Sequence, residues 1–151
     1  MGKKTGLQAT LNLTPHSTMI GPVAAFVQEF ANARKLGENL SNLISTAAKA
    51  ALEVILASQT WTFESPPIGL SLLESNTHLD MVIRNHAKPL GTADIARFET
   101  LMAERAVTPD LFAQIKIDNQ EKSGQSILLR IKLPEPTTCE DDDDEDEGET
   151  P

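Results

Sequence analysis

The chain has 151 residues, of which 40% are apolar, and a formal net charge of −9. This length gives room for one domain with a single core, and no uninterrupted apolar run reaches the roughly 18 residues that cross a bilayer. Residues 1–6 lack the apolar stretch of a signal peptide, so we expect a cytoplasmic protein with no membrane partner. The single cysteine, Cys139, argues against a disulfide scaffold and a cysteine-based zinc site.

The first half of the domain predicts one strand and two helices. Residues 7–13 alternate apolar and polar side chains, which is typical of a half-buried strand. Apolar residues then recur at helical spacing over 17–37, with a cap at Ser17 or Thr18, which predicts a helix of about five turns. A second helix starts at residue 39 or 41 and ends near Ser58. It is apolar on nearly all sides, so we expect it to be buried.

The second half of the domain predicts four strand regions around one short helix. Pro66 and Pro67 interrupt the first strand region, which places it at an edge or a bulge. The short helix begins at a cap, Thr92 or Asp94, and continues through Met102. The last two strands are joined by a polar loop, as in a hairpin. The four strand regions are residues 61–63 with 68–73, then 79–84, 111–117 and 127–133.

These elements follow one another as strand, helix, helix, strand, strand, helix, strand, strand. The pattern indicates the α/β (α+β) class, as a two-layer sandwich with about three helices on one face of a mixed β-sheet. The sequence contains no internal repeat and no glycine-rich phosphate loop of the G-x-x-x-x-G-K type.

Negative charge is concentrated at one end of the sequence. Ten of the 22 acidic residues lie in 135–149, which leaves 12 acidic against 13 basic residues elsewhere. The run 140–147 holds only carboxylates, which repel one another and have nothing to bury. The near-neutral remainder argues against direct binding of nucleic acid. We therefore divide the chain into a flexible N-terminus (1–6), a single domain (7–134) and a disordered acidic tail (135–151).

Three stretches of the sequence resemble a known family. They are the long second helix with its apolar stretch 43–57, the strand entering Asn85-His-Ala-Lys-Pro-Leu-Gly91, and the final strand within 124–134. With the order of elements, they resemble the histidine-kinase-like (GHKL) ATPase fold over about residues 7–134, in particular its anti-sigma-factor serine-kinase branch. In that family a Glu-x-x-x-Asn helix motif supplies a base and a Mg²⁺ ligand, and an Asp-x-Gly-x-Gly/Pro turn binds adenine through its aspartate.

The resemblance places five candidate nucleotide-site residues in this chain. Lys49 stands at the family's glutamate and Glu53 at its asparagine, so Glu53 is the candidate Mg²⁺ ligand if Mg-ATP binds. Asn85, Ala87 and Pro89 match the second motif, where Asn85 takes the place of the adenine-binding aspartate. Only Pro89 agrees with the family pattern.

The departures argue against catalysis. Lys49 cannot act as a carboxylate base, whereas Glu53 can still offer Mg²⁺ an oxygen. Asn85 can accept a hydrogen bond from adenine, but without the help of a charge. Ala87 adds a Cβ where the family has glycine, and residues 92–109 contain no Gly-x-Gly pair to cover phosphates. We expect no enzymatic activity and no bound cofactor, with ATP and Mg²⁺ as the cofactors if the site works.

A simpler interpretation treats these helix residues as a solvent-exposed polar stripe. Ser45, Thr46, Lys49 and Glu53 share one side of the second helix, and Lys49 with Glu53 forms an i,i+4 ion pair worth about 0.3 kcal/mol. The histidines show no spacing of metal ligands.

Three functions from different classes fit the sequence. The first is a regulator that binds a protein partner, either sigma-factor-like or anti-anti-sigma-like, on a degenerate ATPase scaffold. The second is an active ATP-dependent protein serine kinase. The third is an unrelated sandwich whose acidic tail occupies a basic groove of a partner. A homodimer is compatible with each of them.

Overall fold

A computed structural model describes residues 8–58, 60–62, 64–86, 90–120 and 124–133. Five strands and three helices follow one another in the order that the sequence predicts. They are β1 (Gln8–Leu13), α1 (Ile20–Ala33), α2 (Glu38–Ala57), β2 (Ile68–Glu74), β3 (His78–Asn85), α3 (Thr92–Glu104), β4 (Phe112–Gln120) and β5 (Gly124–Lys132), with short 3₁₀ turns at Ser17–Met19 and Pro109–Leu111. The tail, the N-terminus and two of the candidate residues, Ala87 and Pro89, lie outside the described residues.

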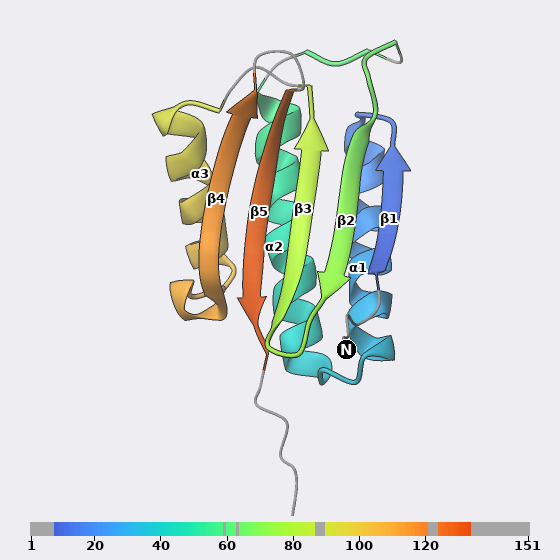
Figure 1. The fold of residues 1–151 in the computed structure, drawn as a ribbon. Helices are drawn as coiled ribbons and strands as arrows, with labels where there is room; N and C mark the ends of the chain where they lie inside the picture. Colours follow the sequence, from blue (N-terminus) through green and yellow to red (C-terminus); the bar gives the residue numbers. More distant parts are fainter. Residues whose placement is uncertain (1–7, 59, 63, 87–89, 121–123, 134–151) are drawn as a thin grey trace, which may run out of the picture.

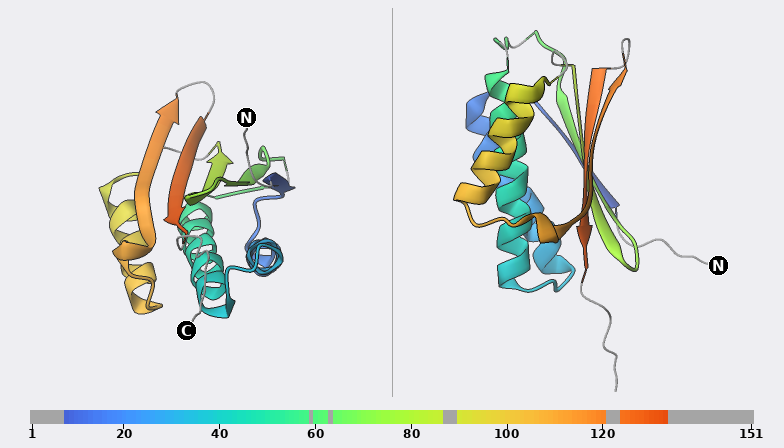
Figure 2. Two further views of the ribbon diagram at one scale, coloured as in Figure 1. Left: turned by 60° about the horizontal axis from the view of Figure 1, so that its bottom comes forward. Right: turned by 90° about the vertical axis from the view of Figure 1, so that its left-hand side faces the viewer.

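The five strands form one sheet in the order β1-β2-β3-β5-β4, and the three helices cover one of its faces (Figures 1 and 2). The predicted two-layer α+β sandwich is therefore confirmed. The prediction of a mixed sheet is wrong in one respect, because all four strand pairings are antiparallel. The strands β3 and β4 do run in the same direction, but β5 lies between them (Figure 1).

The core lies between the helix layer and the inner face of the sheet. Alternate residues of each strand point inward, as in β3, where Leu79, Met81 and Ile83 are buried. The helix α2 lies in the middle of the helix layer and presents small residues to its neighbours, so that α1 and the sheet can approach it closely. The buried polar Ser45 is satisfied, because its hydroxyl donates a hydrogen bond to the carbonyl oxygen of Ala24 at 3.1 Å.

Two local predictions need correction. The cap of the first helical segment is His16, whose ring accepts from the Thr18 amide, and the α-helix proper starts only at Ile20. The helix ends at Ala33, because the chain turns through positive φ before α2. No strand covers residues 60–62, and Phe63 lies outside the described residues. The Trp61 indole instead donates a hydrogen bond to the Ile55 carbonyl at 3.3 Å, near the end of α2.

One described helix, α2, is long and apolar enough to cross a membrane by length and composition alone. Its most apolar window is 56% buried inside the fold, where α2 faces the sheet and lies between α1 and α3 in the helix layer. A core helix passes the same test, so this finding is weak evidence for a membrane span.

Candidate functional site

The carboxylate of Glu53 on α2 is held by an arginine that the sequence analysis did not single out. Arg105 lies at the C-terminal end of α3, and its guanidinium donates two parallel hydrogen bonds to Glu53, at 2.6 and 2.9 Å. These bonds lower the pKa of the Glu53 carboxyl, and the nearby charges of Arg105 and Lys49 act in the same direction. The same pair raises the pKa of Arg105. Glu53 and Arg105 therefore form a fixed ion pair between the two helices.

This pair limits what Glu53 can bind. Both of its carboxylate oxygens accept from Arg105, and its side chain is only 26% exposed. A Mg²⁺ ion at Glu53 would have to displace the guanidinium first and would then lie beside an unpaired positive charge. Within the described ranges, no group of three or more histidine, cysteine or acidic side chains is placed to hold a metal ion.

The predicted polar stripe on α2 is divided between two environments. Lys49 is exposed to solvent, whereas Ser45 is buried against α1. Lys49 lies one turn before Glu53, but the partner of Glu53 is Arg105 and not Lys49. The structure therefore supports a solvated Lys49 and replaces the expected Lys49–Glu53 pair with a contact between two helices.

The second motif begins with a buried amide network. Asn85 ends β3 and is 1% exposed. Its carboxamide oxygen accepts from the Gln125 side chain at 2.9 Å, and the Gln125 oxygen accepts from the Leu90 amide at 3.2 Å. Asn85 and Gln125 are direct partners across β3 and β5. The Asn85 side-chain oxygen, which the family resemblance assigns to adenine, is thus used to hold β5 and the segment before α3.

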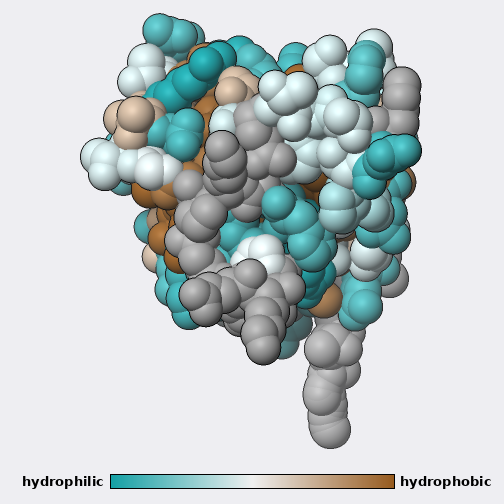
Figure 3. Space-filling model, turned by 90° about the horizontal axis from the view of Figure 1, so that it is seen from above, coloured by the Kyte–Doolittle hydropathy of each residue, from teal (hydrophilic) through white to brown (hydrophobic). Residues whose placement is uncertain are grey.

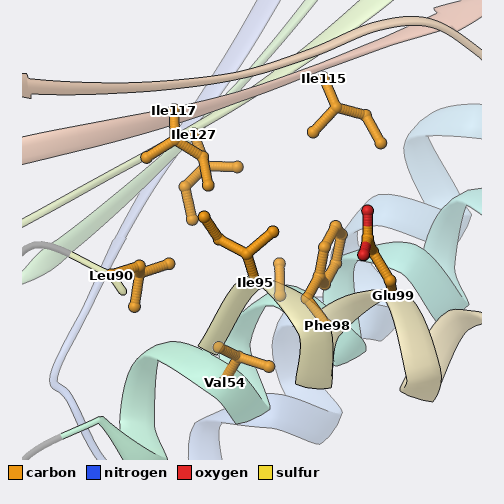
Figure 4. Close-up of a pocket in the computed structure, with 9 residues that line it drawn as sticks. Val54, Leu90, Ile95, Phe98, Glu99, Ile115, Ile117 and Ile127 are labelled. Atoms are coloured by element: carbon orange, nitrogen blue, oxygen red, sulfur yellow. The ribbon is translucent and has the colours of Figure 1, made fainter. Parts of the chain in front are cut away.

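A cavity of about 330 Å³ lies between α2, α3 and the β4–β5 end of the sheet (Figure 4). Its lining is apolar except for the carboxylate of Glu99, which projects beside Phe98. Neither Glu53 nor Asn85 contributes to it. The lining residues are Ala51, Val54, Leu90, Ile95, Phe98, Glu99, Ile115, Ile117 and Ile127.

The chemistry of this cavity does not suit a nucleotide. The described residues of its lining offer no cation or hydroxyl to a phosphate, and Glu99 would repel one. Aliphatic and aromatic walls instead favour apolar groups, because each side chain that leaves water there gains the usual transfer free energy. Periodicity alone assigns Ile95, Phe98, Ile115 and Ile117 to an ordinary core, so no sequence pattern indicates a cavity.

Comparison with protein families and with curated proteins found no family model and no relative that matches this chain. The candidate site is therefore interpreted from its geometry.

The Glu53–Arg105 pair makes a prediction about pH. Glu53→Gln should lower the free energy of unfolding at pH 7 by about 1–2 kcal/mol, because it removes a two-bond, partly buried ion pair. The pKa of Glu53 lies below its ordinary value of 4.5, so its contribution is present above pH 4.5 and is lost as the pH falls through the folded-state pKa. Urea unfolding from pH 7 to pH 3 should show the difference from wild type shrinking with acidity.

Glu29→Gln, which changes an exposed carboxylate on α1, is the matched control and should leave stability nearly unchanged. A Glu53→Gln penalty that stays constant down to pH 3 would contradict the assigned role of the ion pair.

Proposed function

We propose that this chain is a cytoplasmic regulatory protein that acts by binding a protein partner, on a scaffold that resembles a GHKL ATPase of the anti-sigma-factor branch. One observation carries the proposal: two side chains at the positions of the family's nucleotide site serve internal contacts. Glu53 is bonded twice to Arg105, and the buried Asn85 is bonded to Gln125.

These contacts favour a structural role for the side chains at the family's nucleotide site over a catalytic role. A phosphoryl-transfer site keeps its metal ligand and its base available to Mg²⁺, water and substrate. Here Lys49 takes the place of the base, and freeing Glu53 would leave Arg105 as a partly buried cation without its partner. We therefore assign no catalytic role to Lys49, Glu53 or Asn85, and we expect neither ATP nor Mg²⁺ to be required.

Hydrophobic surface that the fold leaves exposed supports protein binding. Hydrophobic residues reach the surface on the side where α3 and β4 lie (Figure 3), and Ile115 of β4 is 42% exposed. Apolar surface beside a cavity is typical of a protein interaction site. The partner class that the family resemblance favours is a sigma-factor-like or anti-anti-sigma-like regulator.

Capture of a partner by two forms of the chain tests this function against the tail hypothesis. The full chain and a chain ending at Pro134 are immobilised and exposed to an extract of the cells that make the protein, and their captured proteins are compared. We expect both forms to retain the same partner, because the folded domain supplies the binding surface. Loss of the partner on removal of residues 135–151 would move the activity to the acidic tail, whose charge suits a basic groove.

A further inference from the structure

The outer edge of the strand β4 is not paired with any described residue. This strand is the last of the sheet and pairs with β5 on one side only. Residues 112–120 contain no proline, and after an irregularity between Phe112 and Gln114 the register is regular to Gln120, so this part of the edge can pair with a further strand. Among the described residues only Leu73 and Ile115 are large hydrophobic side chains with substantial exposure, and Ile115 is the more exposed. Ile115 opposes the buried Leu129 and therefore points to the helix side of the sheet.

The helix α3 extends beyond this edge. Figure 1 shows α3 outside β4 at the margin of the molecule, and the right-hand view of Figure 2 shows it in the helix layer, separated from the plane of the sheet. None of the described strands thus covers the outer part of α3. The cavity lies under this incomplete corner, with Ile95, Phe98 and Glu99 from α3 facing Ile115 and Ile117 from β4 (Figure 4).

We propose that an extended segment of a protein partner pairs with the outer edge of β4 as a sixth strand and inserts its inward side chains into the cavity above α3. This inference rests on the proposed protein-binding function and specifies its surface. Backbone hydrogen bonds to β4 supply part of the affinity, and pockets for alternate side chains supply the selectivity. The added strand occupies the position above α3 that the sheet leaves open.

The cavity and its charge define the partner segment. Side chains of a strand point to the same face at every second residue, so two aliphatic or aromatic residues at positions i and i+2 meet the apolar walls. Among the described residues that line the cavity, Glu99 is the only charged one. A lysine or arginine in the partner segment is attracted to this carboxylate.

Two other occupants fit the corner less well. The chain's own residues 134–151 contain ten carboxylates and no isoleucine, leucine, valine or phenylalanine, so they have nothing to fill an apolar cavity beside Glu99. A second copy paired edge to edge would be related by a two-fold axis through the sheet, which places its helices on the same face. The two α3 helices, each extending past its own edge, would then compete for the same space.

Selection from a phage-displayed library of random nine-residue peptides, with the full chain as bait, tests the inference. We expect the enriched peptides to alternate large apolar residues and to contain lysine or arginine. One enriched peptide is then synthesised and titrated against variants. Ile115→Asp and Glu99→Lys should each weaken its binding at least about tenfold. Glu104→Lys, an exposed charge reversal on the same helix outside the cavity lining, should change it less than about twofold.

Hydrogen exchange locates the bound peptide on the wild-type protein, so the result does not depend on whether a variant folds. In the wild-type complex the amides of β4 should exchange more slowly, while those of the other edge strand, β1, should be unchanged. Enriched peptides without alternation, no enrichment, binding that survives Ile115→Asp, or protection at β1 would each overturn the inference. So would a doubled mass in light scattering that Ile115→Asp abolishes, because a second copy would then occupy the edge.

The experiments distinguish a failure of the β4-edge proposal from a failure of the proposed protein-binding function. If the cellular partner is still captured by Ile115→Asp, protein binding stands and the β4 edge is rejected. If no partner is captured at all, the proposed function fails whatever the peptides do.

Discussion

Leu52→Ala is expected to lower the free energy of unfolding by about 3–4 kcal/mol. Leu52 lies in the second half of α2, the central helix, and is completely buried. The substitution removes three side-chain carbons from a core whose neighbours are held by α1 and the sheet, so the space cannot easily close. Urea unfolding followed by circular dichroism measures the loss.

Leu56→Ala is the matched control for this prediction. Leu56 lies one turn further along α2 but is only partly buried, so the same change should cost clearly less, about 1–2 kcal/mol. Equal losses at both positions would contradict the placement of α2, because they would mean that the last turn of this helix is covered as deeply as the turn that carries Leu52.

Gly124→Ala is expected to cost about 2–4 kcal/mol. Gly124 begins β5 at φ +83°, and a Cβ on it would lie 2.2 Å from the backbone oxygen of Asn85. The contact is with backbone, so β3 and β5 would have to move apart where Asn85 and Gln125 form their hydrogen bond. The substitution therefore strains the turn and disturbs the buried amide network together.

Gly21→Ala provides the comparison, measured in the same urea titration. Gly21 lies in the first turn of α1 and has nothing within 4 Å of an added Cβ, so alanine there should be neutral or stabilising by up to about 1 kcal/mol. Gly124→Ala as stable as wild type would show that the β3–β5 end is not packed as described.

Much of the fold could be predicted because periodicity and turn residues act locally. Alternation in β1 and the long apolar stretch of α2 each identified an element within a few residues. The all-antiparallel sheet could not be predicted, since it depends on β5 entering between β3 and β4, a choice made by long-range packing. His16 was missed as a cap because serine and threonine follow it immediately and are the commoner capping residues.

Less of the candidate site could be predicted, because its contacts join distant parts of the sequence. The family resemblance pointed to Glu53 and Asn85, but their partners, Arg105 and Gln125, lie 52 and 40 residues away. No spacing rule connects such pairs. The cavity beneath Ile115 could not be predicted from the sequence either, because residues around a cavity and residues in a filled core follow the same apolar pattern.

Thermal unfolding of the full chain with and without Mg-ATP tests most directly whether the positions of the family's nucleotide site have lost their affinity for nucleotide. Millimolar Mg-ATP is expected to leave the midpoint of thermal unfolding unchanged, because Glu53 and Asn85 are bonded to Arg105 and Gln125 and Lys49 stands in place of the base. A native state that binds Mg-ATP would be stabilised by about 2.7 kcal/mol at a hundredfold excess over Kd. A rise in the midpoint that corresponds to this stabilisation would contradict the loss of the nucleotide site and would support the serine-kinase hypothesis.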